Sequence, residues 1–382
     1  MLNSRPVIFI ADNSVAVTGA LVAIRNASDQ LKARYEFVYI LPTGSSGKQV
    51  LEQAGYQVHE LPFVEISRRK TALLRYGPML LLNGWRLHRL AQLHKASIIH
   101  LNDFYNLTGY VAKLLSLGKL QVVTHVRFLP QSLPQPLART WRWLAERFAD
   151  RVLCVSEAVR RYFSATDKVR VVFDPIPTAE KHAVSVVPAQ RSDKTVQLLY
   201  LSNYIQGKGQ NFAFEAFRKA YMRNDRLRLT FVGGDMGLEK NRQFRQQLEV
   251  QVQQHGLAAV VTFGGFVTDV EKRIKEADIL LNFSESESFS LTCLDALYYG
   301  TPLIATDCGG PAELFEHGKS GLLVPNRDVD AMAEAIGRLA ADPAERARFA
   351  AAGRDYVRHK FQQATTYEKL GRIYQELLGA KA

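Results

Sequence analysis

Short apolar runs alternate along the chain with longer stretches in which apolar residues recur every three or four positions. Runs of the first kind predict buried β-strands, and stretches of the second kind predict amphipathic helices. The strands predicted in the first half are Pro6–Ala11, Glu36–Leu41, Ser97–Leu101, Leu120–His125, Arg151–Val155 and a short one at Val171–Pro177. Helical periodicity separates them, as at Leu137–Phe148. Strands that alternate with helices predict a parallel sheet covered by helices on both faces.

The pattern is interrupted between Thr178 and Lys194, where the chain is polar, loses its periodicity and contains Pro188. A second alternating series follows, with predicted strands at Val196–Ser202, Leu227–Gly233, Val260–Phe263, Ile279–Phe283 and Pro302–Thr306. Predicted helices in this series include Gln362–Leu378 and Val329–Leu339, the latter with Asp328 as its N-cap.

The interruption predicts two domains. The first would be residues 1–178, followed by a linker at 179–194 and a second domain at 195–361. The length of 382 residues suits two domains of about 150–200 residues each. The C-terminal helix, about residues 362–380, is a candidate to pack back on the first domain. Two doubly wound domains would face a central cleft at the carboxyl ends of their strands, where such sheets bind ligands.

The composition excludes several classes of protein. A hydrophobic content of 47% and a charged content of 23% are ordinary for a globular protein. There is no apolar run of about 18 residues, so no segment is expected to span a membrane, and Val7–Ala11 is too short for a secretory signal. Cys154, Cys293 and Cys308 are far apart and lack metal spacing, which argues against a disulfide or zinc site and fits a reducing cytoplasm.

The net charge of +12 is divided unevenly. Residues 1–190 hold 24 basic and 13 acidic residues, a balance of +11, whereas residues 191–382 hold 25 and 24, a balance of +1. An excess confined to one half predicts that this half faces an anionic partner, unless it only makes the surface soluble. Nucleic acid is not favoured as that partner, because the chain has neither a Cys/His finger nor an aromatic RNA-binding signature.

The segment Ser284–Asp295 (SESESFSLTCLD), directly after a predicted strand, is the richest in candidate chemistry. Glu287 stands at the exit of the strand, and Asp295 follows about two turns into the next helix. Between them Ser288–Leu291 would form the first helical turn, whose unpaired N–H groups and positive dipole end bind anions. Two carboxylates beside such a turn suit a nucleotide sugar, since each accepts hydrogen bonds from vicinal hydroxyls while the turn takes the diphosphate. The alternative is that the carboxylates only cap the helix or lie in solvent.

Two further turns follow predicted strands. Leu198–Gly209 ends in a turn whose two glycines flank Lys208, so that the ammonium group can reach a phosphate as a point charge. This is not the phosphate loop of nucleotide hydrolases, and exposed lysines in turns are common. Asp12–Gly19 lacks the three-glycine dinucleotide fingerprint, which argues against a nicotinamide or flavin enzyme. Gly19 still permits close approach of a ligand to a helix start, although a plain strand-to-helix turn explains it equally well.

Taken together, these segments resemble glycosyltransferase family 4, a family of retaining enzymes with the GT-B fold. The family's Glu, seven residues, Glu element is similar to Glu287 to Asp295. The similarity continues over about forty residues with preserved spacing, through Tyr299–Asp307 (YGTPLIATD), Gly309–Glu313 (GGPAE) and Gly318–Pro325 (GKSGLLVP). Ser202–Gly209 resembles the family's Gly-Arg element followed by Lys-Gly, and Val261–Phe266 (VTFGGF) resembles its third strand. In the first half the match is limited to Ile98–His100 and Val123–His125.

The resemblance implies two Rossmann-like domains and roles for individual residues. Glu287 would bind hydroxyls of the donor sugar near the reacting carbon, and Asp295 would bind the ribose. Lys208 would neutralise the diphosphate leaving group, and His125, from the first half, would lie close to the reacting sugar. The other implied donor-binding residues are Ser290 and Leu291 through their N–H groups, Phe289, Asn203, Gly19 and, beside the base, Phe266 and Val267. No metal cluster is visible, and no cofactor is implied because the nucleotide sugar is a substrate.

Two positions depart from the family pattern. Asp295 stands where the family usually has Glu, which is one methylene longer. Asn203 stands where the family has a phosphate-binding Arg. This second change removes a charge from the leaving-group clamp, so it implies weaker donor binding or a replacement arginine such as Arg127.

The expected function is therefore transfer of a sugar from a nucleotide-diphosphate sugar to a saccharide acceptor. Negative charge builds on the diphosphate as its bond to the anomeric carbon breaks, so stabilising that group is the main catalytic work. Two alternatives remain open. One is a UDP-sugar 2-epimerase, which should lack the Glu287 to Asp295 element. The other is a two-lobed protein that binds a sugar or nucleotide without turning it over.

A basic amphipathic segment predicts a membrane surface as a further partner. Ile66–Leu90 contains six arginines or lysines and no acidic residue, with leucines and Trp85 among them, and Gly77-Pro78 predicts two short helices. An apolar face bordered by arginines is typical of a helix in a bilayer interface, and a core helix is the alternative. With the basic Leu137–Arg151, this predicts a peripheral enzyme on the cytoplasmic face that glycosylates a lipid-linked cell-envelope precursor.

Overall fold

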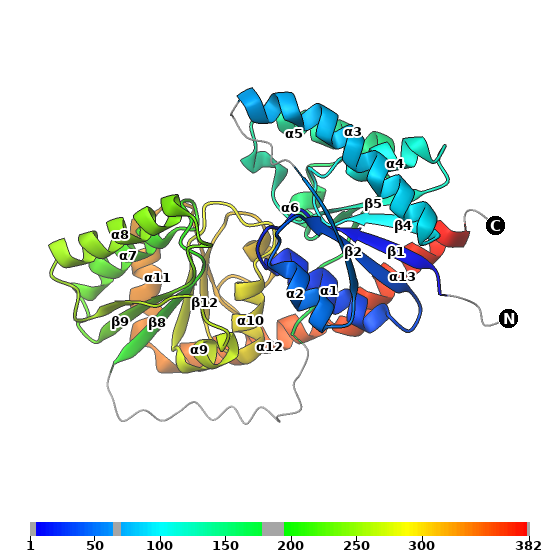
Figure 1. The fold of residues 1–382 in the computed structure, drawn as a ribbon. Helices are drawn as coiled ribbons and strands as arrows, with labels where there is room; N and C mark the ends of the chain where they lie inside the picture. The colour runs from blue at the N-terminus through cyan, green and yellow to red at the C-terminus, as the bar shows by residue number, and fades with distance from the viewer. Residues whose placement is uncertain (1–4, 64–69, 178–194, 380–382) are drawn as a thin grey trace. The chain divides into compact units, whose positions relative to one another are not determined.

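The computed structural model describes residues 5–63, 70–177 and 195–379, which fall into two compact units. One unit holds the chain up to Asp174 together with the residues from Ala364 onward, and the other holds Pro175–Gln363. Each is built on a parallel sheet with helices on both faces (Figure 1), so the expected α/β architecture of two Rossmann-like domains is confirmed. The predicted linker, residues 179–194, lies outside the described residues.

The described part of the first unit forms a seven-stranded parallel sheet in the order β3-β2-β1-β4-β5-β6-β7. Its strands are β1 (Val7–Ala11), β2 (Glu36–Pro42), β3 (Gln57–Leu61), β4 (Ala96–Leu101), β5 (Gln121–Val126), β6 (Arg151–Cys154) and β7 (Val169–Val171). The order reverses between β1 and β4. The loops after these two strands therefore border the crevice in which doubly wound sheets bind ligands.

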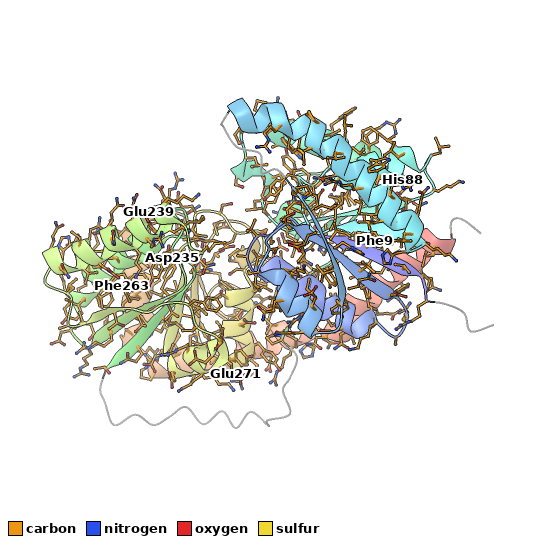
Figure 2. All side chains as sticks on the ribbon, in the orientation of Figure 1. Phe9, His88, Asp235, Glu239, Phe263 and Glu271 are labelled. Atoms are coloured by element: carbon orange, nitrogen blue, oxygen red, sulfur yellow. The ribbon has the colours of Figure 1, made fainter. Side chains whose placement is uncertain are left out.

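The helices of the first unit form two layers (Figure 1). One layer is α3 (Lys70–Leu93), α4 (Thr108–Leu115) and α5 (Gln135–Phe148), the last preceded by the 3-10 turn η1 (Pro130–Ser132). The other is α1 (Gly19–Leu31), α2 (Gly47–Gln53) and α13 (Gln363–Gly379), while the short α6 (Glu157–Arg160) follows β6. Apolar side chains such as Phe9 fill the space between sheet and helices (Figure 2).

The C-terminal helix α13 packs on the sheet of the first unit. Its apolar face is buried in the same cluster as α1 and β2. The Tyr35 hydroxyl donates to the Gly371 carbonyl at 2.9 Å, and the Tyr374 hydroxyl lies 2.7 Å from Nδ1 of His100. The last helix of the chain thus completes the first unit.

The structure corrects the expectation that Gly77-Pro78 divides the basic segment into two helices. α3 runs from Lys70 to Leu93 with Pro78 inside it. A proline removes one backbone hydrogen bond, but close packing holds the remainder of the helix. A Cβ on Gly84 would lie 2.4 Å from the Val111 side chain of α4, so the backbone of α3 packs directly against that side chain. Residues 66–69, and the side chains of residues 70–74, lie outside the described part of the segment.

The strand expected at Val171–Pro177 is also wrong in its extent, because β7 ends at Val171. Two prolines follow, and proline has no N–H for a sheet ladder. The Ile176 N–H between them donates instead to the Phe361 carbonyl at 2.9 Å. The sheets also contain the unpredicted edge strand β3, whose sequence QVHEL lacks an apolar run.

The second unit contains a six-stranded parallel sheet in the order β10-β9-β8-β11-β12-β13 among the described residues. Its strands are β8 (Val196–Leu201), β9 (Leu227–Val232), β10 (Val261–Phe263), β11 (Ile279–Asn282), β12 (Leu303–Thr306) and the short, unpredicted β13 (Leu322–Val324). Its helices are α7 (Gln210–Tyr221), α8 (Glu239–Gln254), α9 (Val270–Glu276), α10 (Leu291–Tyr299), η2 (Gly310–Glu313), α11 (Val329–Ala341) and α12 (Pro343–Lys360). Asp328 is confirmed as the N-cap of α11, since its carboxylate accepts the Ala331 N–H at 3.0 Å. The strand order reverses between β8 and β11, which places the second crevice beside the loops after these strands.

Candidate functional site

Two glycines shape the turn after β8 that presents Lys208. Gly207 and Gly209 have φ values of +93° and +81°, a left-handed backbone that residues with a Cβ rarely adopt. A Cβ on Gly209 would lie 2.0 Å from the Phe283 carbonyl oxygen. Glycine is therefore required for this turn to press against the end of β11, and it brings the two loops at the crevice into contact.

Lys208 and Glu287 form an ion pair between these loops. Lys208 Nζ donates to Glu287 Oε1 at 2.7 Å, and the two side chains are 32% and 15% exposed, so solvent still reaches the pair. The Ser284 hydroxyl donates to the same oxygen at 3.1 Å, and the Tyr200 hydroxyl donates to the Lys208 carbonyl at 2.5 Å. Burial lowers the pKa of Lys208, but the charge and hydrogen bond of Glu287 outweigh it and raise the pKa overall. The ammonium group therefore remains charged at neutral pH.

The start of α10 differs from the expected turn over Ser288–Leu291. The helix begins at Leu291, and Ser290 is its N-cap, with its hydroxyl accepting the Cys293 N–H at 3.4 Å and an N–H of Asn282 at 3.0 Å. Ser290 has a φ of +78°, a strained value for a residue with a Cβ. Strain of this kind persists where the surroundings hold it, and it is frequent at binding sites.

The late start of α10 follows from the pairing of the preceding backbone. The Gly310 N–H donates to the Glu287 carbonyl at 2.8 Å, so the chain is still held in a bridge at this point. Phe289, which the resemblance implied as donor-binding, has its side chain in the core, with its ring 5.5 Å from that of Phe361. Its side chain is therefore not available to a ligand.

Asp295 lies about two turns beyond the pair, on α10. Its carboxylate has no hydrogen bond or ion pair with any residue that the structure describes. Burial raises its pKa from 3.8 to about 7. A half-buried carboxyl group without a protein partner is an available acceptor for ligand hydroxyls.

Asn203 and the loop after β10 both approach the loop after β9. The Asn203 side-chain oxygen accepts the Gly234 N–H at 3.1 Å, so this amide braces the loop after β9. Phe266 is highly exposed, and its Cβ would lie 3.4 Å from a Cβ on Gly234. An exposed aromatic ring at the carboxyl end of a parallel sheet offers a stacking surface, with Val267 half-buried beside it.

The first unit carries a polar network that the sequence analysis did not assemble. Asn102 donates to Asp12 at 2.6 Å and accepts from Arg127 Nε at 2.7 Å. Arg127 Nη1 in turn pairs with Asp174 at 2.7 Å, and these two side chains are only 9% and 11% exposed. Arg127 is therefore held inside its own unit, which argues against its expected use as a replacement phosphate ligand. The positions of these residues in the sequence could have indicated the network, since Asp12, Asn102 and Arg127 each directly follow a strand of the sheet.

His125 and Gly19, two further expected site residues, both belong to the first unit. His125 is buried at the end of β5, with its ring 5.3 Å from that of His100. Burial first, and then the charge of Arg127, lower the pKa of His125 well below its usual range and that of His100 to about 3. Both imidazoles are therefore neutral. Gly19 is the first residue of α1, after the N-cap Thr18.

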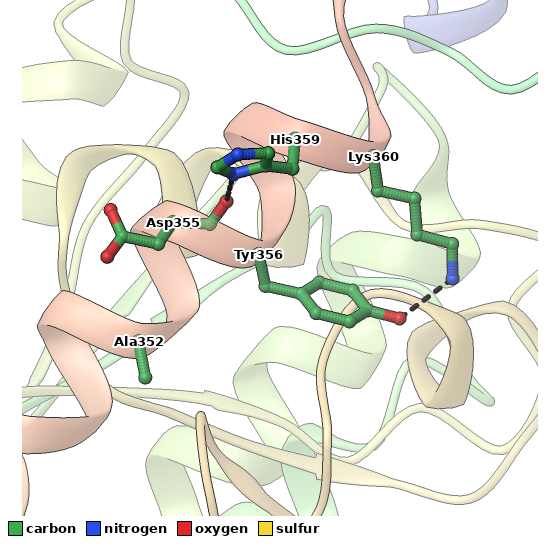
Figure 3. A pocket seen from close by; sticks show the side chains of 5 residues that line it. All are labelled: Ala352, Asp355, Tyr356, His359 and Lys360. Atoms are coloured by element: carbon green, nitrogen blue, oxygen red, sulfur yellow. Dashed lines mark hydrogen bonds between the residues drawn. The ribbon is translucent and has the colours of Figure 1, made fainter.

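Other features of the described residues add no competing site. Within them there is no group of three or more His, Cys, Asp or Glu side chains suited to a metal ion, and no helix long and apolar enough to cross a membrane. An open surface depression on α12 is lined by Ala352, Asp355, Tyr356, His359 and Lys360 (Figure 3). Two of its polar side chains bind each other, since Lys360 donates to the Tyr356 hydroxyl at 2.8 Å.

Two families match consecutive parts of the chain. Residues 17–180 match the family described as Glycosyltransferase Family 4, and residues 187–356 match Glycosyl transferases group 1. The α-1,3/1,6-mannosyltransferase ALG2 of Homo sapiens is 30% identical over 256 residues, which is 62% of this chain and 61% of that protein. The GDP-mannose-dependent α-(1-6)-phosphatidylinositol monomannoside mannosyltransferase of Mycobacterium tuberculosis is 31% identical over 179 residues, 44% of this chain and 45% of that protein. The matches thus span about half of the length of these curated relatives.

Solved structures resemble the whole chain. HepE of Anabaena, in complex with UDP and glucose, superimposes with a TM-score of 0.80 at 20% identity and covers 97% of this chain and 100% of its own. Sucrose-phosphate synthase from Thermosynechococcus elongatus has a TM-score of 0.77 at 22% identity and covers 99% and 100%. At these identities the likeness shows the fold.

Proposed function

The chain belongs to glycosyltransferase family 4, and we propose that it transfers a sugar from a nucleoside-diphosphate sugar to a saccharide acceptor with retention of anomeric configuration. One observation carries the proposal: a solvent-accessible lysine and carboxylate pair lies at the crevice of the second unit, and about two turns further on lies a carboxyl group with no partner among the residues that the structure describes. A cation, an acceptor for sugar hydroxyls and an acceptor for ribose hydroxyls are the groups that a nucleotide sugar requires.

In this proposal Lys208 stabilises the leaving group. Its charge is fixed beside Glu287, so it needs no reorganisation when negative charge grows on the departing diphosphate. The first N–H groups of α10, at Ser290 and Leu291, add a positive dipole end for the same oxygens. Glu287 accepts hydrogen bonds from the donor sugar, and Asp295 accepts them from the ribose. No residue is assigned as a nucleophile.

The test of this function has two stages. Melting of the unaltered protein with UDP, GDP and ADP identifies the base, because a ligand that binds only the folded state raises the melting temperature. Release of the free nucleoside diphosphate from the matching sugar donor is then measured with and without a crude acceptor fraction. Acceptor-dependent release supports a transferase. Binding without release would favour a sugar- or nucleotide-binding protein, and conversion of the donor sugar to its 2-epimer would favour an isomerase.

We further propose that the acceptor is lipid-linked and that the first unit docks on an anionic membrane surface. The layer formed by α3, α4 and α5 exposes large apolar side chains, among them Trp85 and Trp143 at 51% and 60%. Exposed arginines flank both tryptophans, such as Arg89 on α3 and Arg147 on α5. Apolar anchors bordered by arginines suit the boundary between headgroups and acyl chains, and each basic residue near an anionic leaflet contributes about 1 kcal/mol. The core-helix alternative accounts only for the opposite side of α3, where Leu87 is buried.

Vesicle sedimentation tests this surface. Binding to vesicles that contain an anionic lipid should fall as salt rises, because exposed charges are screened. The double variant Trp85→Ala, Trp143→Ala should lose binding, whereas Met222→Ala, which removes a still more exposed apolar side chain from the second unit, should not. Equal binding to neutral and anionic vesicles, or none to either, would leave a soluble acceptor as the better interpretation.

A further inference from the structure

Arg327 occupies a strained position in the loop that follows β13. Its φ is +64°, a left-handed value that a residue with a side chain rarely adopts. Its side chain is 67% exposed and forms an ion pair with Glu285. The side-chain amide of the adjacent Asn326 donates to the Glu285 carbonyl at 2.8 Å. Both the side chain and the backbone of Glu285 therefore hold this loop to the loop after β11.

Glu285 connects Arg327 to the turn that presents Lys208. The Glu285 N–H donates to the Gly207 carbonyl at 2.9 Å, and its Oε1 lies 3.9 Å from where a Cβ on Gly207 would be. The Glu285 carboxylate thus lies between the guanidinium group of Arg327 and the turn that presents Lys208. Four charges gather here, two positive and two negative, since Lys208 is itself paired with Glu287.

A diphosphate group meets too little positive charge in this arrangement. Among the described residues Lys208 is the one cation that contacts Glu287. The arginine expected beside it is replaced by Asn203, whose side chain braces the Gly234 N–H. Arg127 is held by Asp174 inside the first unit. Arg327 is the alternative, because its side chain is largely in solvent and an ion pair with one exposed partner is weak enough to be exchanged. Its planar guanidinium group also binds phosphate oxygens in pairs, which an ammonium group does not.

We propose that Arg327 is a ligand of the donor's diphosphate, held in reserve by Glu285 in the empty protein and supplying the cation that Asn203 lacks. The inference rests on the proposed function, since it names a further residue of the same donor site. In the bound state the guanidinium group exchanges the Glu285 carboxylate for phosphate oxygens. Glu285 then competes with the ligand for Arg327, so the negative charge of Glu285 weakens diphosphate binding.

The experiment measures nucleoside diphosphate and monophosphate affinities by calorimetry, with the base identified from UDP, GDP and ADP. Arg327→Ala should weaken diphosphate binding about tenfold, with a smaller loss for the monophosphate, because a hydrogen-bonded charge contact is removed. Arg327→Lys should recover part of the loss. Glu285→Gln should tighten binding by about threefold, and only while Arg327 is present, because it frees the guanidinium group. Arg242→Ala, which breaks a comparable exposed pair with Glu239 on α8, is the matched control and should change nothing.

Arg327→Gly separates strain from charge, since it relieves the left-handed backbone while removing the cation. It should weaken diphosphate binding as much as Arg327→Ala without a loss of melting temperature. Unchanged affinity in both variants would overturn the inference, as would an equal effect of Glu285→Gln with and without Arg327. If the unaltered protein binds none of the three diphosphates, the proposed function itself fails, and that outcome is distinct from the others.

Discussion

The two units collect polar side chains at the same point of the same architecture, where the strand order reverses. In the first unit these side chains satisfy one another. Asp12, Asn102, Arg127 and Asp174 form an unbroken chain of contacts of 2.6 to 2.7 Å, and the ion pair within it is nearly closed to solvent. Such a network braces the loops at the end of the sheet.

In the second unit the polar side chains stay open. Lys208 and Glu287 are paired but remain in reach of solvent, Asp295 has no partner among the described residues, and Arg327 is largely exposed. Glycine at 209 lets the Lys208 turn press against the end of β11. Topology thus decides where polar groups gather. Whether these groups hydrogen-bond to one another decides whether the cluster supports the fold or stays open to a ligand.

The largest effect should come from breaking the closed network. Arg127→Ala leaves the Asp174 carboxylate buried without its partner, so the free energy of unfolding should fall by about 3–5 kcal/mol. Urea denaturation followed by circular dichroism measures this change. Lys208→Ala is the comparison, because the open pair should cost about 1 kcal/mol or less. Equal losses of unfolding free energy in the two variants would contradict the contrast between a closed network in the first unit and an open ion pair in the second.

Catalysis should show the reverse ranking in the open site. Glu287→Ala should lower turnover by about 10²-fold or more, on the order of 3 kcal/mol, with little change in melting temperature. Lys208→Ala should reduce turnover more than it weakens donor binding, because its charge acts on the growing charge of the leaving group. Rates of nucleoside diphosphate release at several donor concentrations separate the two parameters. A rise in the Michaelis constant alone would make Lys208 a uniform binder.

The Asp295 carboxyl group, which has no partner in the described part of the chain, should make donor binding depend on pH. The pKa of Asp295 is raised to about 7, so the carboxylate that accepts ribose hydroxyls is lost as the pH falls through this value. Affinity for the nucleoside diphosphate should therefore drop by a few fold, about 1 kcal/mol, between pH 8 and pH 6. Stability should change in the opposite direction, because a raised carboxyl pKa means that folding favours the protonated form. Stability should decline as the pH rises from about 4 to about 7.

Asp295→Asn checks both parts of this expectation, since the amide does not titrate. Calorimetry and thermal melting across the same pH range should both become flatter in the variant. A pH profile of affinity identical to that of the unaltered protein would remove Asp295 from the donor site.

The smallest effect should come from restoring the family arginine. Asn203→Arg adds a cation beside Lys208 but removes the brace on Gly234, so nucleoside diphosphate affinity should rise by about threefold at most, or about 0.6 kcal/mol. The gain should be larger when Arg327→Ala is also present, because the two arginines would do the same work. Calorimetry on the four combinations measures this coupling. Independent effects would mean that Asn203 and Arg327 act on different parts of the ligand.

The sequence by itself determined the architecture and most element positions. Ten predicted strands match observed ones to within about two residues at each end, and Asp328 was identified as an N-cap from its place before an apolar periodicity. These features are local, because the pattern of apolar and polar residues over a few consecutive positions is enough to indicate a strand or a cap. The spacing of Glu287 and Asp295, and the glycines around Lys208, were readable for the same reason. The roles given to these residues stay predictions.

Only the tertiary structure decided which groups meet. It joined α13 to the first unit, carried α3 through Pro78, delayed the start of α10 to Leu291 and committed Arg127 to Asp174. It also fastened Arg327 to Glu285, which lies 42 positions earlier in the chain. None of these follows from a local pattern, because each depends on the packing or pairing energy of segments that are distant in sequence. That energy exists only once the sheet order has brought their loops together.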